Sequence, residues 1–145
     1  MKAWKFHLDT DAILQKSSNS QILDLPLATI RAAFYFEHRF IFKKTNGKLN
    51  TQLGVDVTYN TLYHPYAYMP ATGRFYRQID TEAGSYPYVN LFLNFKLQRT
   101  RIFLMFDHMN YGMMGASLSK KYYMVPDYPM NITMFRFGFA WTFYN

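Results

Sequence analysis

Near its end the sequence reads Thr133-Met134-Phe135-Arg136-Phe137-Gly138-Phe139-Ala140-Trp141-Thr142-Phe143-Tyr144, in which every second residue from Phe135 to Phe143 is a large aromatic. Neighbouring side chains of a β-strand point to opposite faces, so this strand has one face of rings. The rings belong to Phe135, Phe137, Phe139, Trp141 and Phe143. A facing sheet would have to interdigitate with these rings, whereas lipid imposes no such fit. The pattern predicts the barrel-closing terminal strand of an outer-membrane β-barrel.

The composition of the 145 residues supports a membrane barrel over a helical membrane protein. Half of the residues are hydrophobic and 20% are aromatic, yet the mean hydropathy is slightly negative at −0.22. Apolar residues are therefore interleaved with polar ones, and no stretch approaches the roughly 20 apolar residues of a transmembrane helix. Because only helices and closed barrels satisfy their backbone groups in lipid, a membrane location requires a barrel.

The net charge of +7 does not indicate nucleic acid as a partner, because the basic residues are spread along the chain without a recognisable binding motif. The absence of cysteine excludes disulfides and thiolate metal sites. We expect no cofactor.

Alternating hydrophobicity predicts six strands in a single β-barrel segment covering residues 1–145. The expected strands are at about 2–15, 27–43, 49–63, 88–98, 101–110 and 132–145. Several far exceed the usual 5–6 residues, but they suit tilted strands that cross a bilayer in about 9–11 residues and continue beyond it.

The connections between these strands alternate in length. Long loops are expected at roughly 16–26, about 64–87 and about 111–131, and short turns at 44–48, which contains Asn46-Gly47, and at 98–101. Outer-membrane barrels have long external loops and short periplasmic turns. The alternation predicts that the three long loops are external.

Six strands are fewer than the eight of the smallest outer-membrane barrels. The start, Met1 to His7, also lacks the apolar core of a signal peptide. We therefore expect the C-terminal part of a larger barrel, completed by its remaining strands or by an oligomeric partner. Two open edges would make six strands alone prone to aggregation.

The loop residues resemble the putative porin family of Bacteroidetes outer membranes over essentially the full length. The most specific stretch is the tyrosine-rich loop Ala67-Tyr68-Met69-Pro70-Ala71-Thr72-Gly73. Further similar residues are Leu53 to Asp56, Tyr59 to Thr61, Phe75, Tyr76, Gln78, Tyr86, Pro87, Phe92, Asn94, Lys96, Arg99, Arg101, Phe103, His108, Asn110, Tyr128 to Met130, Phe135, Gly138, Trp141 and Phe143. The chain departs from the family in Asp107, where Glu is expected, in Asn90, where Asp is expected, and in Asn145, which ends the chain.

The resemblance implies an outer-membrane barrel that matches the C-terminal portion of the family. It implies location in the cell outer membrane, contact with outer-membrane lipid, and recognition of the aromatic end strand by the barrel-assembly machinery.

The charged residues on the polar faces of the strands are the candidates for lining a wet lumen. They are Arg31, Glu37, Arg39, Asp56, Lys96, Asp107 and Arg136. In a pore such charges would set the electrostatics of the lumen. The alternative, compatible with the first, is that they pair across neighbouring strands and hold the wall together.

No catalytic or metal site is predicted. The four histidines lie on different strands and faces without the spacing of metal ligands. Glu37-His38 and Asp107-His108 are adjacent pairs, whose side chains point to opposite faces of a strand. We therefore expect a protein that is not an enzyme.

The sequence predicts a porin-like outer-membrane channel for passive diffusion of small solutes. One alternative is a soluble lipocalin-like barrel that binds a hydrophobic ligand, because alternation does not tell inside from outside. The long strands, unequal loops and aromatic end strand favour lipid. Another is a barrel enzyme acting on lipid or protein, which would need catalytic side chains clustered at one rim.

Overall fold

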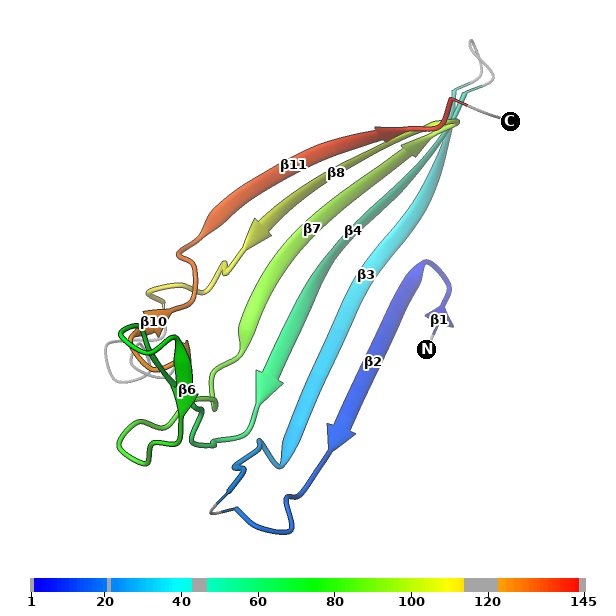
Figure 1. Cartoon of the computed structure of the whole chain (residues 1–145). Coiled ribbons are helices and arrows are strands. Elements are labelled where there is room, and N and C mark those ends of the chain that lie inside the picture. The colour runs from blue at the N-terminus through cyan, green and yellow to red at the C-terminus, as the bar shows by residue number, and fades with distance from the viewer. Residues whose placement is uncertain (1, 21, 43–46, 114–122, 144–145) are drawn as a thin grey trace.

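The structure, a computed structural model, describes residues 2–20, 22–42, 47–113 and 123–143 (Figure 1). All regular structure in these residues is β. The long strands are β2 (Phe6–Leu14), β3 (Ala28–Phe42), β4 (Gly47–Asn60), β7 (Tyr88–Leu97), β8 (Thr100–Asp107) and β11 (Met134–Trp141). The short ones are β1 (Lys2–Ala3), β5 (Ala67–Met69), β6 (Arg74–Tyr76), β9 (Tyr123–Val125) and β10 (Tyr128–Pro129). In the described part of the chain, no helix has the length and apolar character needed to cross a membrane.

The six long strands form one antiparallel sheet in the order β2-β3-β4-β7-β8-β11, with β1 beside the start of β2. Each long strand pairs with the next long strand along the chain, in continuous register. Figure 1 shows the sheet as a curved wall. The prediction of an all-β, six-stranded antiparallel sheet is confirmed. The sheet is open: among the described residues, β11 pairs with β8 and with no strand on its other side.

The long loops gather at one end of the sheet, where β6 and β10 lie (Figure 1). The predicted loop 64–87 contains the β5–β6 hairpin, and an isolated bridge joins Tyr63 to Ala83. The predicted loop 111–131 contains the β9–β10 hairpin, while its residues 114–122 lie outside the described part. The tight connection between β7 and β8 lies at the opposite end of the sheet.

Four strands differ from the predicted boundaries by three residues or more, and one of them is the strand predicted over 49–63, which begins at Gly47 and ends at Asn60 as β4. The sequence predicts one strand over 2–15, whereas the chain turns at Trp4, whose φ of 59° is incompatible with a strand. The strand predicted over 101–110 ends at Asp107, because His108 has a φ of 52°. Strand β11 ends at Trp141. Residues 44–46 of the predicted Asn-Gly turn, with Lys43, Tyr144 and Asn145, lie outside the described residues.

The sheet has no conventional hydrophobic core. In the described part, the buried hydrophobic side chains are those of Ala67, Ala83 and Tyr86, all in the loop region. Large apolar side chains on the strands are instead exposed, by 80% for Leu14 and by 73% for Phe137 and Phe139. An apolar surface of this extent marks contact with lipid or protein rather than with water.

Candidate functional site

The strand register collects polar side chains on one face of the sheet. Glu37 of β3 lies opposite Gln52 of β4, which lies opposite Asn94 of β7. Directly paired residues share a face, and residues two apart along a strand return to it. By this register the predicted lumen candidates all lie on one face: Arg31, Glu37, Arg39, Asp56, Lys96, Asp107 and Arg136. We call it the polar face.

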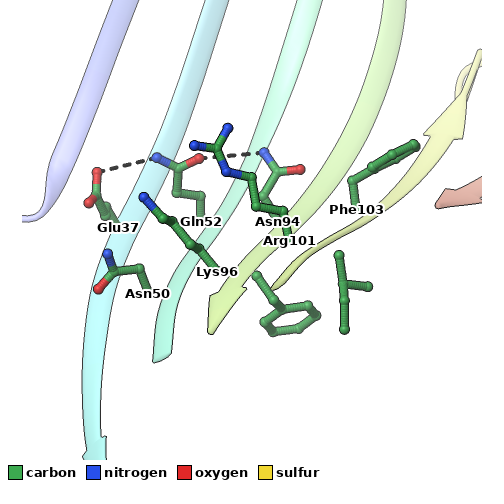
Figure 2. Close-up of a pocket in the computed structure, with 9 residues that line it drawn as sticks. Glu37, Asn50, Gln52, Asn94, Lys96, Arg101 and Phe103 are labelled. Atoms are coloured by element: carbon green, nitrogen blue, oxygen red, sulfur yellow. Dashed lines mark hydrogen bonds between the residues drawn. The ribbon is translucent and has the colours of Figure 1, made fainter. Parts of the chain in front are cut away.

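Several hollows lie on the polar face, and two of them adjoin at Gln52 and Asn94. One, of about 480 Å³, is shown in Figure 2 and is lined by Glu37, Asn50, Gln52, Asn94, Phe95, Lys96, Arg101, Ile102 and Phe103. A second, also of about 480 Å³, lies nearer the loops and is lined by Arg31, Ala33, Tyr35, Gln52, Asp56, Asn90, Phe92, Asn94, Met105 and Arg136. Four adjacent strands contribute to the first hollow, so the sheet is concave on its polar side.

Two ion pairs form on the loop half of the polar face. Nε of Arg31 donates to Oδ2 of Asp56 at 2.8 Å, and Arg136 pairs with Asp107. Both carboxylates are buried, whereas the arginine side chains are 61% and 57% exposed. A buried carboxylate without a cation would be costly, so these arginines both neutralise the wall and reach into the hollow.

A hydrogen-bonded ladder of side chains crosses the middle of the polar face. Nε2 of Gln52 donates to Oε2 of Glu37, and Nδ2 of Asn94 donates to Oε1 of Gln52, each at 3.4 Å (Figure 2). Nε2 of His7 lies 3.6 Å from Oε2 of Glu37. The ladder links four strands, β2, β3, β4 and β7, through side chains as well as through the backbone.

The opposite face of the sheet is apolar, and on β11 it is a row of rings. The predicted terminal-strand aromatics are exposed by 53% for Phe135, 73% for Phe137 and Phe139, 59% for Trp141 and 78% for Phe143. Their neighbours are further rings: Phe135 packs against Phe106 at 4.9 Å between centroids, and Trp141 stacks on Phe143 at 5.8 Å. We call this the aromatic face.

All 145 residues match the family described as putative porin. The chain belongs to this family. Membership indicates a membrane protein with a porin-like role. Comparison with curated proteins and with solved structures gave no match.

In this porin-family chain, several residues beside the predicted charges also face the hollows. The amides of Asn50, Gln52 and Asn94 were not among the predicted site residues, and neither was Arg101, which the sequence places in a turn. Because side chains alternate between faces along β4 and β7, the sequence pattern already places these three amides on the polar face. Arg101 follows from register, because β8 begins at Thr100 directly after the turn.

Aromatic rings also lie on the polar face. The sequence pattern does not single them out, because their neighbours on that face are polar. Phe92 and Tyr35 flank Gly54 with their ring centroids 6.2 Å apart, and the ring of Phe103 covers Gly138. In each case an aromatic side chain lies across a strand that has no side chain there. The signal in the sequence is a glycine opposite an aromatic residue in register.

The fully buried His108 holds the loop ends of three strands together. Nδ1 lies 2.5 Å from the carbonyl oxygen of Asn131, and Nε2 lies 2.7 Å from the Tyr86 hydroxyl. A carbonyl only accepts, so Nδ1 donates to Asn131. The backbone N–H of His108 donates to Asn90 at 3.0 Å, and its carbonyl accepts from Thr133 at 2.8 Å. These contacts assign His108 a structural role.

Among the described residues, no group of three or more His, Asp or Glu side chains is arranged to hold a metal ion. His38 lies on the aromatic face against Phe40, 4.5 Å between ring centroids, and is thus separated from Glu37 on the polar face.

Proposed function

We propose that the chain forms part of the wall of a passive diffusion channel in the cell outer membrane, with the polar face toward the pore and the aromatic face toward lipid. One observation carries the proposal: the hollowed side of the sheet is polar, while the other side exposes a continuous row of rings. A water-filled lumen and a surrounding bilayer call for this arrangement.

Strand length supports the same orientation. The long strands have 8 to 15 residues, compared with the roughly 9–11 that a tilted strand needs to cross a bilayer. Closure would come from further strands added at β2 and β11, either from the same barrel or from an oligomeric partner. In this proposal the barrel-assembly machinery recognises the aromatic strand β11.

The polarity of the two faces separates a channel from a soluble ligand binder. A lipocalin-like barrel would need its apolar side chains on the hollow side, around the ligand, and its charges outside. Here Arg31, Glu37 and Arg136 face the hollows, while Phe137 faces away from them. The buried carboxylates are paired with arginines, and this pairing stabilises the wall of the sheet. Because the carboxylates are accounted for in this way, we propose a channel rather than an enzyme.

Cysteine accessibility tests the proposal cleanly, because residues 1–145 contain no cysteine. Adjacent positions on β7 supply a matched pair, Asn94→Cys on the polar face and Leu93→Cys on the aromatic face. In planar bilayers we expect wild-type channels to conduct. A charged methanethiosulfonate reagent should reduce the current through Asn94→Cys channels and leave Leu93→Cys channels unchanged.

Two results would overturn the proposal. One is a protein that purifies as a soluble monomer without detergent and forms no channels. The other is a channel in which the Leu93→Cys position reacts with the charged reagent and the Asn94→Cys position does not, because the faces would then be reversed.

A further inference from the structure

Positive charge is concentrated at the turn end of the polar face. The register places Arg39 opposite Asn50, Asn50 opposite Lys96, and Lys96 opposite Arg101. These residues form one row across four adjacent strands, so the Cα atoms of the three cationic residues lie within three strand spacings, about 14 Å. Lys48 lines a neighbouring hollow together with Arg39 and Lys96.

These cations differ from the other arginines of the polar face in their partners. Arg31 and Arg136 form ion pairs with buried carboxylates. Nε of Arg39 donates instead to the neutral Oδ1 of Asn50 at 2.9 Å, which orients the guanidinium and leaves its charge in place. Within the described residues, no carboxylate oxygen lies within 4.0 Å of a charged nitrogen of Arg39, Lys96 or Arg101.

The carboxylate that lines the hollow of Figure 2 together with Lys96 and Arg101 is Glu37, which lies one step nearer the loops, whereas Arg39 lines the neighbouring hollow. The Glu37 carboxylate accepts a hydrogen bond from Gln52 at 3.4 Å and lies 3.6 Å from Nε2 of His7. His7 is on β2, on the far side of β3 from the strand that carries Arg101. Figure 2 shows Lys96 and Arg101 directed into the same space as Gln52. Among the residues that line these two adjoining hollows, there is one carboxylate, Glu37, and there are four cations, Arg39, Lys48, Lys96 and Arg101, so the turn end of the polar face has an excess of positive charge.

The hollow is suited to small anions. Guanidinium groups bind carboxylate and phosphate oxygens through two parallel hydrogen bonds, and ammonium groups add a mobile point charge. The amides of Asn50 and Asn94 supply further neutral donors at the same wall. A volume of about 480 Å³ accommodates a solvated small organic anion.

We propose that the row of Arg39, Lys96 and Arg101 is an oxyanion-binding site that makes the channel selective for small carboxylate- or phosphate-bearing solutes. The inference rests on the proposed channel function and adds the substrate class to it. Rings of basic side chains are the device by which pores select anions.

The test uses assembled protein in planar bilayers of phosphatidylcholine, a lipid without net charge, so that dissolved ions are the source of any bound anion. Reversal potentials are measured in a KCl gradient near 0.1 M, where the Debye length is about 10 Å and surface charge still acts. Inorganic phosphate is then added as the probe. We expect a chloride permeability about threefold or more above that of potassium, and block by phosphate.

The triple substitution Arg39→Gln, Lys96→Gln and Arg101→Gln should bring the permeability ratio near one and raise the apparent Kd for phosphate about tenfold. The matched control removes three cations in or beside the long loops, with Lys16→Gln, Arg74→Gln and Arg77→Gln, and should retain the wild-type ratio. Arg39→Lys with Arg101→Lys preserves charge, so it should keep the chloride preference but weaken phosphate block.

The outcomes distinguish the two proposals. Absence of conductance in the wild type would overturn the channel function itself. Channels that prefer potassium, or a triple variant with the selectivity of the wild type, would overturn the anion site and leave the channel function standing. If the triple variant does not assemble, Lys96→Gln and Arg101→Gln as single changes should each shift the reversal potential toward zero, and no shift in either would refute the site.

Discussion

Two glycines of the polar face lie under rings, but their surroundings differ. A Cβ added at Gly54 would lie 2.6 Å from the backbone oxygen of Phe34 and 2.7 Å from Cζ of Phe92. A Cβ added at Gly138 would meet the ring of Phe103, with Cε1 at 2.7 Å. Backbone cannot move aside within a paired sheet, whereas a ring at the end of a side chain can rotate.

We therefore expect Gly54→Ala and Gly138→Ala to have different effects. Gly54→Ala should destabilise the folded barrel by about 1–3 kcal/mol, the usual cost of overpacking. Gly138→Ala should fold nearly as well as wild type but push the Phe103 ring into the hollow and lower the single-channel conductance. Urea titration followed by unheated electrophoresis measures the first effect, and bilayer recording the second.

Gly73 supplies a control for the general effect of replacing glycine. It has a φ of 63° and nothing within 4 Å of an added Cβ, so Gly73→Ala should cost about 1 kcal/mol through backbone strain and leave conductance unchanged. Equal conductance in Gly138→Ala and wild type would show that the Phe103 ring does not border the path of the ions.

At the scale of elements, an ion pair joins the segment before β3 to the segment after β4. Oδ2 of Asp24 accepts from the backbone N–H of His64 at 3.0 Å and lies 2.8 Å from its Nδ1. Glu82 lies 3.8 Å from the other ring nitrogen. Burial alone would raise the pKa of Asp24, but the hydrogen bonds and positive charge of His64, together with Arg77, outweigh it and lower this pKa below 3.8.

This shift predicts how the contact depends on pH. Because the pKa of Asp24 is lowered in the folded state, its contribution is fully present above about pH 3.8 and is lost as the pH falls through the lowered pKa. Protection of the His64 amide from hydrogen exchange, corrected for intrinsic rates, should fall over that range. Asp24→Asn should show weaker protection without this pH dependence; the same dependence in Asp24→Asn would assign the effect to another group.

The elements show which parts of the structure follow from local pattern. The two faces of β3, β4 and β7 could be predicted, because a period of two fixes side-chain direction wherever a strand is continuous. The turn at Trp4 could not, since a left-handed tryptophan has no local signal. The position of His108 also could not, because its partners Tyr86 and Asn131 are 22 and 23 residues away. The excess of positive charge at the turn end could not be predicted either, because it depends on the strand register that aligns Arg39 with Lys96 and Arg101.

For the whole molecule, the outer edge of β11 decides how the sheet is completed. The backbone N–H of Thr142 donates to the carbonyl of Arg99 at 3.1 Å, toward the neighbouring strand β8. Successive N–H groups of a strand point to alternate sides, so even-numbered residues of β11 donate toward β8 and odd-numbered ones donate outward. Phe139 therefore presents a donor at the open edge, and Ala140 does not.

Proline substitutions test whether that edge is paired in the assembled protein. Proline removes a backbone donor and is tolerated at true edges but not inside a sheet. If another strand covers β11, Phe139→Pro should reduce the folded fraction in outer membranes about as much as Ala140→Pro, and far more than Phe139→Ala. If Phe139→Pro behaves like Phe139→Ala, the edge is free and the barrel is not closed there.

Because charges are paired unevenly along the strands, the two ends of the wall differ in net charge. Near the loops the arginines are offset by Asp56 and Asp107, whereas near the turns the cations of the row face a single carboxylate. Mobile anions would accumulate at one mouth of a pore and be depleted at the other, as in a diode. A channel built from this wall should therefore rectify, passing more current at one sign of the membrane voltage than at the other.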